Sequence, residues 1–447
     1  MAEADDDEPV YYVISDLHIG GDEQLEHVEF LDELLAFLER LRTTTEPVEL
    51  VINGDAFGLW EFTTIEGIEK FDALVDRYPE LFAQLRETGA EIQITLLPGN
   101  HDHELAAYDE YVDRFAEYNV DLVQEQSLTR RVGEGAIWFE HGNQRDPNNQ
   151  IEDFGNPHAK PLGYYYNTLV TSRAGQVSGL GRKNWLKDIQ AVTPTERVPV
   201  WLLSKYFYHE MNPLLRYAAV PFLLLFNLSV LLAILAGLDL AGIWEMPTAP
   251  IEAALGYLGP VGTVVYTLLA VNVAIAGIMV LIWIPVRFVL QDIKKAVNRF
   301  ELVETEFTVD PNEPYLEAAG DIFEEHPATV VFCYGHTHRP AVNRRDDRVV
   351  VNTGTWLKRF HRRDVIAGLL PPVFHPTFRL SIVRIAAEPE GVAVEYETME
   401  KPDPAAEDLT LTERLLTVGR VPEPDIPERV VVDPDSVPDG GVEESTD

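Results

Sequence analysis

The chain has 447 residues, enough for one large domain with additions or for two to three domains. Acidic residues outnumber basic ones by 74 to 35, and the formal net charge is −39. This acidity repels phosphate backbones, so it argues against nucleic acid as a partner. It is also a means of solvation in concentrated salt, where the charges are screened, and we interpret it chiefly as a halophilic surface. The single cysteine, Cys333, excludes an intramolecular disulfide.

The predicted elements alternate between strands and helices in the first part of the chain. Short apolar runs predict strands, and helical spacing of apolar residues predicts helices between them. The strands are expected at 10–16, 48–53 and 92–97, and the helices at 26–42 and 66–87. Further strands are expected at 136–140, 328–334 and 348–352, with a β-hairpin at 380–399. The pattern indicates an α/β domain with helices outside a sheet.

Two long apolar stretches interrupt this pattern in the middle of the chain. Residues 218–238 carry no charge, and neither do residues 253–286, within which 261–286 is the best span. A helix of 21 residues is about 31 Å long, which matches the core of a bilayer. The stretches therefore predict a transmembrane hairpin, with a buried hairpin or an apolar dimer interface as the alternative.

The charges flanking these stretches predict an orientation. The connecting loop, 239–260, has acidic residues but no Lys or Arg. The outer flanks are basic, with Arg197, Lys205 and Arg216 before the first span and Arg287, Lys294, Lys295 and Arg299 after the second. The positive-inside rule then predicts a cell-membrane protein with both termini and the catalytic domain in the cytoplasm.

Five short segments carry candidate ligands, and each follows a predicted strand. They are Asp16-Leu17-His18, Gly54-Asp55, Gly99-Asn100-His101-Asp102, His141-Gly142 and Gly335-His336-Thr337-His338. Loops that follow adjacent strands meet at one edge of a sheet, so these segments can share one site. Their donors are carboxylate or amide oxygens and imidazole nitrogens, a set that suits Mn, Fe or Zn better than Ca or Mg.

This series of motifs resembles the calcineurin-like metallophosphoesterase family over residues 10–150 and 325–400. The resemblance implies a two-sheet β-sandwich flanked by helices and two divalent metal ions, with Mn expected first. It implies that one ion is held by Asp16, His18 and His338, that Asp55 bridges both ions, and that the second is held by Asn100, His141 and His336. His101 would stabilise or protonate the leaving oxygen, and Asp102 would orient His101. The acidic residue that usually follows Gly-Asp by a few positions is not evident.

The implied reaction is hydrolysis of a phosphate ester or pyrophosphate bond by a hydroxide that bridges the two ions. In the loop after His141, Arg145 and Asn143 are expected to bind substrate. The narrower expectation is a lipid-linked or nucleotide substrate held near membrane lipids. The alternatives are a nuclease or phosphodiesterase acting on nucleic acid, and a non-catalytic membrane scaffold with a vestigial site.

These expectations divide the chain into five parts. Residues 1–150 and 293–401 form the two halves of the catalytic domain, 151–212 a cap or a membrane-adjacent helical segment, 213–292 the hairpin, and 402–447 an acidic disordered tail. The basic segment 356–363 (WLKRFHRR) is expected to contact anionic lipid or a remote phosphate of the substrate, with an ordinary surface helix as the alternative.

Overall fold

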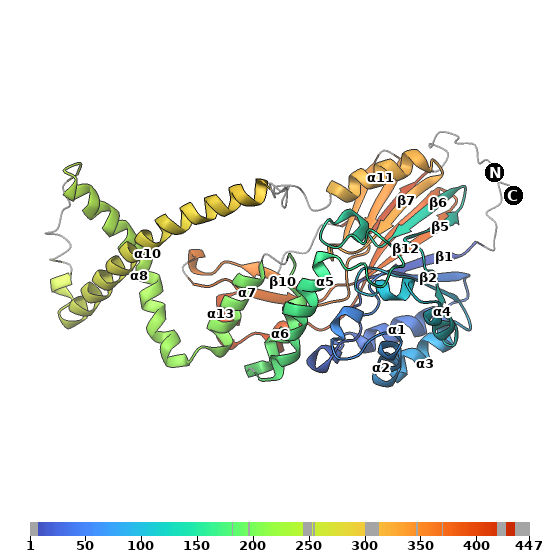
Figure 1. Ribbon diagram of the computed structural model, residues 1–447, viewed down its shortest axis with the longest axis horizontal. Helices are drawn as coiled ribbons and strands as arrows, with labels where there is room; N and C mark the ends of the chain where they lie inside the picture. Colours follow the sequence, from blue (N-terminus) through green and yellow to red (C-terminus); the bar gives the residue numbers. More distant parts are fainter. Residues whose placement is uncertain are drawn as a thin grey trace.

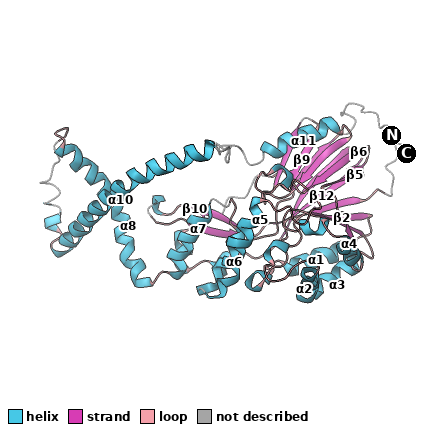
Figure 2. Ribbon diagram, in the orientation of Figure 1, coloured by secondary structure: helices cyan, strands magenta, loops and turns pink. Residues whose placement is uncertain are grey.

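The computed structural model of the chain contains two β-sheets, several layers of helices and a pair of long apolar helices (Figures 1 and 2). It describes residues 8–180, 182–194, 197–244, 253, 255–299, 313–345, 347–368, 370–417 and 426–433.

The first sheet has seven strands in the order β14-β13-β12-β1-β2-β3-β4. Its parallel half consists of β1 (Val10–Ile14), β2 (Val48–Asn53), β3 (Gln93–Leu97) and β4 (Asp121–Leu122). Its antiparallel half consists of β12 (Leu380–Glu388), β13 (Gly391–Met399) and β14 (Arg429–Val432). The predicted strand 48–53 and the predicted hairpin 380–399 are confirmed.

The second sheet has five strands in the order β5-β6-β7-β9-β8. They are β5 (Ser127–Val132), β6 (Gly135–Glu140), β7 (Thr329–Tyr334), β9 (Arg348–Asn352) and β8 (Ala341–Arg345). The three central strands, β6, β7 and β9, are parallel, although more than 180 residues separate β6 from β7 in the sequence. The two halves of the domain therefore meet in this sheet.

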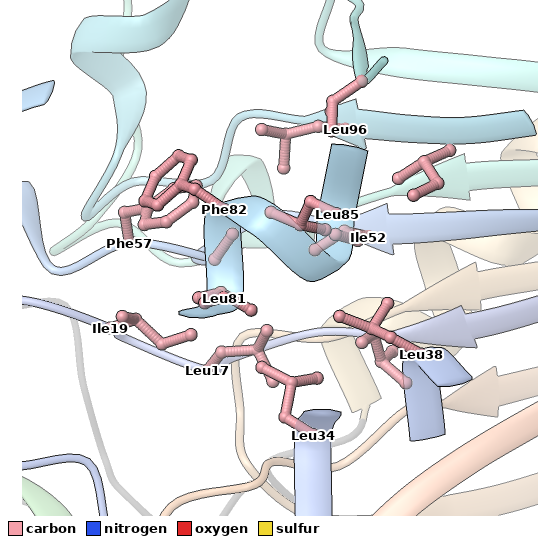
Figure 3. Packing of buried hydrophobic residues seen from close by; sticks show 14 of the residues in the cluster. Leu17, Ile19, Leu34, Leu38, Ile52, Phe57, Leu81, Phe82, Leu85 and Leu96 are labelled. Atoms are coloured by element: carbon pink, nitrogen blue, oxygen red, sulfur yellow. The ribbon is translucent and has the colours of Figure 1, made fainter. Parts of the chain in front are cut away.

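The two sheets pack face to face, and helices cover their outer faces. Because side chains alternate along a strand, Leu50 and Ile52 of β2 face one hydrophobic cluster and Val51 faces another, shared with Val331 of β7. On the outer face of the first sheet lie α1 (Leu31–Arg42), α2 (Glu69–Arg77), α3 (Pro79–Thr88) and α4 (Asp109–Ala116). Figure 3 shows Leu81, Phe82 and Leu85 of α3 within this cluster. Helix α11 (Glu313–Glu325) covers the second sheet. The predicted β-sandwich flanked by helices is confirmed.

Two helices differ from the prediction, one by a break in its middle and one by a later start. The single helix expected at 66–87 is two helices, because Pro79 lacks the backbone N–H that would continue α2 and instead begins α3. Helix α1 begins at Leu31 rather than at residue 26, since the preceding residues form a short 3-10 turn, Glu23–Glu26.

Short helices follow the first half of the domain, among them α5 (Leu162–Tyr166), α6 (Ser172–Gln176) and α7 (Val198–Lys205). They attach to the sandwich partly through Lys358, whose side chain is 3% exposed. Its ammonium group contacts three carboxylates, at 2.8 Å from Glu29, 3.5 Å from Asp188 and 2.6 Å from Asp408. Burial opposes the charge on Lys358, but these carboxylates raise its pKa overall. Lys358 is thus a structural residue, and it does not reach lipid as the sequence suggested.

The rest of the basic segment forms a strand rather than a surface helix. Strand β10 (Arg359–Arg363) pairs antiparallel with β11 (Val373–Thr377) in a separate two-stranded sheet. Trp201 of α7 packs against Phe360 and Phe374 of this sheet. In β10, Phe360 is buried while Arg359 and His361 are more exposed, because adjacent side chains of a strand point to opposite faces.

Two long helices lie apart from the sandwich and contact each other, α8 (Pro213–Leu240) and α10 (Pro260–Arg299) (Figure 1). Among the described residues, one helical stretch, Pro260–Val289, is apolar and long enough to cross a membrane, with a mean hydropathy of 2.4. In α8 the corresponding apolar stretch is shorter, Leu228–Asp239. The structure gives one candidate span where the sequence predicted two, and a two-span hairpin is not supported. Residues 245–252 of the expected loop lie outside the described residues.

The acidic C-terminal segment contains ordered elements, contrary to the prediction of a disordered tail from residue 402. Helix α12 (Ala405–Asp408) is followed by α13 (Leu411–Leu416), which has a capping box between Thr410 and Glu413. Strand β14 pairs with β13 at the edge of the first sheet. The apolar residues Val430 to Val432 allow this pairing, which the surrounding acidic composition concealed. The expected tail residues 418–425 and 434–447 lie outside the described residues.

Candidate metal centre

The motif loops lie at the carboxyl ends of parallel strands, as the sequence predicted. Asp16 follows β1 and Asp55 follows β2, while Asn100 and His101 follow β3. In the second sheet, His141 follows β6 and His336 follows β7. Because β1, β2 and β3 are parallel, as are β6 and β7, these loops gather where the same edges of the two packed sheets meet.

A first group of ligand atoms brings together Asp16, His18 and His338. Asp16 Oδ1 lies 3.2 Å from His338 Nε2 and 3.9 Å from His18 Nε2. The two imidazole Nε2 atoms are 3.2 Å apart. The other carboxylate oxygen of Asp16 accepts hydrogen bonds from the Ser15 hydroxyl and from the backbone N–H of His336, so the carboxylate is fixed.

A second group brings together Asp55, His141 and His336. Asp55 Oδ2 is 3.1 Å from His141 Nε2 and 3.7 Å from His18 Nε2 of the first group, so it lies between the two groups. The other oxygen of Asp55 accepts the backbone N–H of His101 at 2.7 Å. His141 Nδ1 is 3.0 Å from the backbone oxygen of Asn53, which orients the ring with Nε2 toward Asp55.

The backbone at these ligands is strained. Five of the seven expected ligands have φ between 47° and 65°, a region that non-glycine residues rarely adopt: Asp16, His18, Asp55, His336 and His338. Gly54 has φ of 84°, and a Cβ there would overlap the His141 ring. Such conformations cluster at functional sites, where the surrounding structure holds them in place.

The residues fit a pair of divalent metal ions. The side-chain oxygen of Asn100 is buried and has no hydrogen-bond partner among the described residues, which is costly unless a ligand completes it. Two imidazole nitrogens at 3.2 Å cannot both carry protons without repulsion, whereas both can donate lone pairs to one cation. Mixed nitrogen and oxygen donors suit Mn, Fe or Zn.

Comparison with known proteins identifies the domain. The calcineurin-like phosphoesterase family matches residues 10–231, which include Asp16, Asp55, Asn100 and His141 but not His336 or His338. The chain contains a calcineurin-like phosphoesterase domain. No curated protein matched the chain.

Several solved structures show a weak likeness to this chain. They include a single mutant of Vps29 from Entamoeba histolytica (9% identity, 88% of this chain and 94% of that one, TM-score 0.26) and Vps29 from Cryptosporidium parvum (10%, 89% and 100%, TM-score 0.25). A third is the phosphopantetheinyl hydrolase PptH from Mycobacterium tuberculosis (11%, 78% and 91%, TM-score 0.26).

Electrostatic effects in the candidate metal centre shift the pKa values of its histidines in opposite directions. Burial would lower the pKa of His141, but the Asp55 carboxylate raises it to about 10. Burial and the neighbouring His101 lower the pKa of His18 to about 3. Burial raises the pKa of Asp55, but the histidines around it, His141 first, hold it well below its usual value. The carboxylate of Asp55 therefore stays ionised, which favours a bound cation.

His101 is oriented by an acidic residue that the sequence did not reveal. The Nδ1 atom of His101 lies 2.9 Å from Glu61 Oε1. Glu61 is the last residue of a 3-10 turn, Leu59–Glu61, and lies six residues after Asp55 in the sequence. Burial lowers the pKa of His101, but Glu61 and Asp55 raise it to about 9. The same Glu61 oxygen accepts the side-chain amides of Asn167 and Gln190, each at 3.1 Å. Glu61 thus contacts the site from a position a few residues beyond Gly-Asp, and the spacing alone gave no signal for it.

Asp102 has a different partner from the one expected. Its carboxylate accepts backbone N–H groups from Gly99 at 2.6 Å, Phe57 at 3.1 Å and Asp55 at 3.3 Å. Burial and the Asp55 charge raise the pKa of Asp102 to about 7. Asp102 thus ties the Gly-Asp loop to the Gly-Asn-His-Asp loop, while the orientation of His101 belongs to Glu61.

The expected substrate-binding residues are engaged within the protein. Arg145 pairs with Glu140, its Nε 3.0 Å from Oε1 and its Nη2 3.2 Å from Oε2. The buried amide of Asn143 donates to the backbone oxygen of Asn149 at 3.2 Å. In the same loop, Asp146 Oδ2 lies 3.0 Å from His336 Nε2. Substrate binding by Arg145 and Asn143 stays a prediction, and for Arg145 it requires sharing or exchange of the Glu140 contact.

Proposed function

We propose that the protein is a two-metal phosphoesterase that hydrolyses a phosphate ester or a pyrophosphate bond. The observation that carries this proposal is the position of Asp55, whose Oδ2 approaches a histidine of each ligand group, at 3.1 and 3.7 Å. A carboxylate between two groups of nitrogen and oxygen donors is the arrangement that a pair of ions requires.

The ligands divide between two ions as the motifs implied. Asp16, His18 and His338 would hold one ion and Asn100, His141 and His336 the other, with Asp55 shared. Bound divalent ions supply Lewis-acid activation of water and neutralise charge on the phosphate. The protein positions these donors in advance, through the strained loops and the hydrogen bonds to Asp16, Asp55 and His141.

His101 would act as the acid for the leaving oxygen. Glu61 engages its Nδ1 at 2.9 Å, which leaves Nε2 as the ring nitrogen that donates the proton. The ring lies against His18, with centroids 4.4 Å apart, and beside Trp60. Glu61 favours the protonated imidazole, because its negative charge raises the pKa of His101.

Attachment to a membrane through α8 and α10 is the second part of the proposal. Many large apolar side chains of α10 are exposed, including Leu281 at 71% and Phe288 at 66%, far more than a soluble surface usually shows. This proposal requires that α8, with its shorter apolar stretch Leu228–Asp239, crosses the membrane together with α10. Both termini and the catalytic domain would then lie on the cytoplasmic side, near a lipid-linked or nucleotide substrate. A cysteine at Ile243, in a Cys333→Ala background, should react with an impermeant reagent added to intact cells. Labelling only after lysis would overturn this orientation.

Metal-dependent hydrolysis is the test of the catalytic proposal. The detergent-purified full chain, in high salt with Mn²⁺, should hydrolyse aryl phosphomonoesters or diesters, and Asp55→Asn should reduce turnover at least about 100-fold, because it removes the charge shared by both ligand groups. Asp113→Asn, at an exposed site on α4, is the matched control and should retain activity. Near-native turnover in folded, metal-loaded Asp55→Asn would refute the assignment. If the wild type binds two ions and hydrolyses neither ester, a narrower substrate is required, and if it binds none, the scaffold interpretation replaces this one.

A further inference from the structure

A cleft of about 740 Å³ lies beside the two-stranded sheet, and its lining is strongly basic. Five arginines and one histidine contribute to it: Arg197, Arg339, Arg359, Arg362, Arg363 and His361. Among the described lining residues, Asp364 is the one acid. In a chain of net charge −39, such a concentration of arginine is opposite in sign to the rest of the protein.

Two of these arginines contact described protein oxygens. Asp364 pairs with Arg362, its Oδ1 2.9 Å from Nη2, and Arg363 donates to the backbone oxygen of Thr417 at 2.8 Å. Burial and the nearby guanidinium groups of Arg339 and Arg379 lower the pKa of Arg359 to about 10. Positive groups that lie close together create a strong local potential for an anion.

The cleft is linked by the chain both to the metal centre and to the long helices. Arg339 directly follows the expected ligand His338, and Arg359 and Arg363 are the two ends of strand β10. Arg197 immediately precedes α7, which packs on β10 and β11 through Trp201. In Figure 1, β10 and α7 lie between the sandwich and the pair α8 and α10. An anion in the cleft would therefore lie on the side of the phosphoesterase domain that faces these helices.

We propose that this arginine cleft binds a phosphate group of the substrate other than the phosphate that is hydrolysed. The inference rests on the proposed function and narrows it to substrates that carry a second phosphate beside the one that is hydrolysed, such as nucleoside diphosphates or lipids with a diphosphate. Guanidinium groups suit this task because their planar N–H donors bind phosphate oxygens in pairs. The volume is in the range of small-molecule sites.

Binding of inorganic pyrophosphate to the full chain tests the cleft directly. Calorimetric titrations, with Mn²⁺ and again after removal of metal by EDTA, should be made at one fixed salt concentration because salt screens anion binding. We expect Arg197→Gln and Arg359→Gln to weaken binding to the metal-free protein at least tenfold. Arg131→Gln, at an exposed position on β5, is the matched control and should bind as the wild type does. Equal affinity in all four proteins would overturn the proposal.

Kinetics and a lipid probe separate the sources of the phosphate. With p-nitrophenyl phosphate, which has one phosphate, the two cleft variants should retain kcat/KM, whereas with ADP they should raise KM about tenfold without changing kcat. Equal losses with both substrates would overturn the proposal, because they would indicate damage to the metal centre. Titration with dihexanoyl phosphatidylglycerol distinguishes a lipid headgroup. If binding of this lipid depends on the arginines and binding of pyrophosphate and ADP does not, the cleft binds membrane lipid and the assignment to substrate is wrong. Arginine-dependent pyrophosphate binding without any hydrolysis would retain the cleft and refute the proposed activity.

Discussion

Glu61→Gln isolates the contribution of the carboxylate that orients His101. The substitution keeps the size of the side chain and an oxygen that accepts the amides of Asn167 and Gln190, but it removes the charge beside the imidazole. At pH 7.5 an imidazole with a pKa of about 9 is about 97% protonated, and one near the ordinary value of 6.5 is about 10% protonated. The protonated fraction of His101 should therefore be about tenfold lower in Glu61→Gln than in the wild type.

The pH dependence has a definite sign. Glu61 raises the pKa of His101, so the acid form is present at low pH and is lost as pH rises through that pKa. In Glu61→Gln the decline in kcat on the alkaline side should begin at lower pH than in the wild type. Bound cations lower the pKa of His101 in both proteins, so the prediction concerns the difference between them.

The assay compares two leaving groups between pH 6 and 10. An alkyl phosphate needs a proton on its leaving oxygen more than p-nitrophenyl phosphate does, so Glu61→Gln should slow the alkyl ester by at least about tenfold and the aryl ester much less. Glu66→Gln, an exposed neighbour, is the control. Equal slowing of both esters at every pH, with unchanged metal content, would show that Glu61 has only a structural role.

Two further substitutions test the packing behind the site. Gly54→Ala, at φ of 84° against His141, should weaken metal binding at least about tenfold by metal analysis. Gly67→Ala is the control, because Gly67 also has a positive φ, 59°, but no described atom lies within 4 Å of the added Cβ. It should leave the metal content unchanged. An equal loss of metal in both variants would contradict the steric explanation. Lys358→Met leaves three carboxylates without their buried partner and should cost about 3–5 kcal/mol of unfolding free energy. Lys401→Met breaks one ion pair nearer the surface, with Glu33, and should lower the unfolding free energy by under about 1 kcal/mol. Equal falls in Tm for Lys358→Met and Lys401→Met would contradict the role of the buried network.

The sequence by itself predicted the sandwich and most of the residues that come together in the candidate metal centre. The apolar runs before Asp16, Asp55 and His141 predict strands over short distances, and parallel strands bring their carboxyl ends to one edge. These are local patterns, and for this reason six of the seven expected ligands gather in the structure: Asp16, His18, Asp55, His141, His336 and His338. The apolar stretch within α10 was equally plain, because length and hydropathy are properties of one segment.

Tertiary structure decided which partners the charged residues have. Glu61 faces His101 because a 3-10 turn bends the loop back toward the site, whereas Asp102 is taken by three backbone N–H groups. Lys358 is buried among acids from three distant segments, while Arg359, beside it in the sequence, lines a cleft. Composition marks all of these residues only as polar. Which charge is buried and paired depends on contacts between residues far apart in the chain, and these exist only in the folded protein.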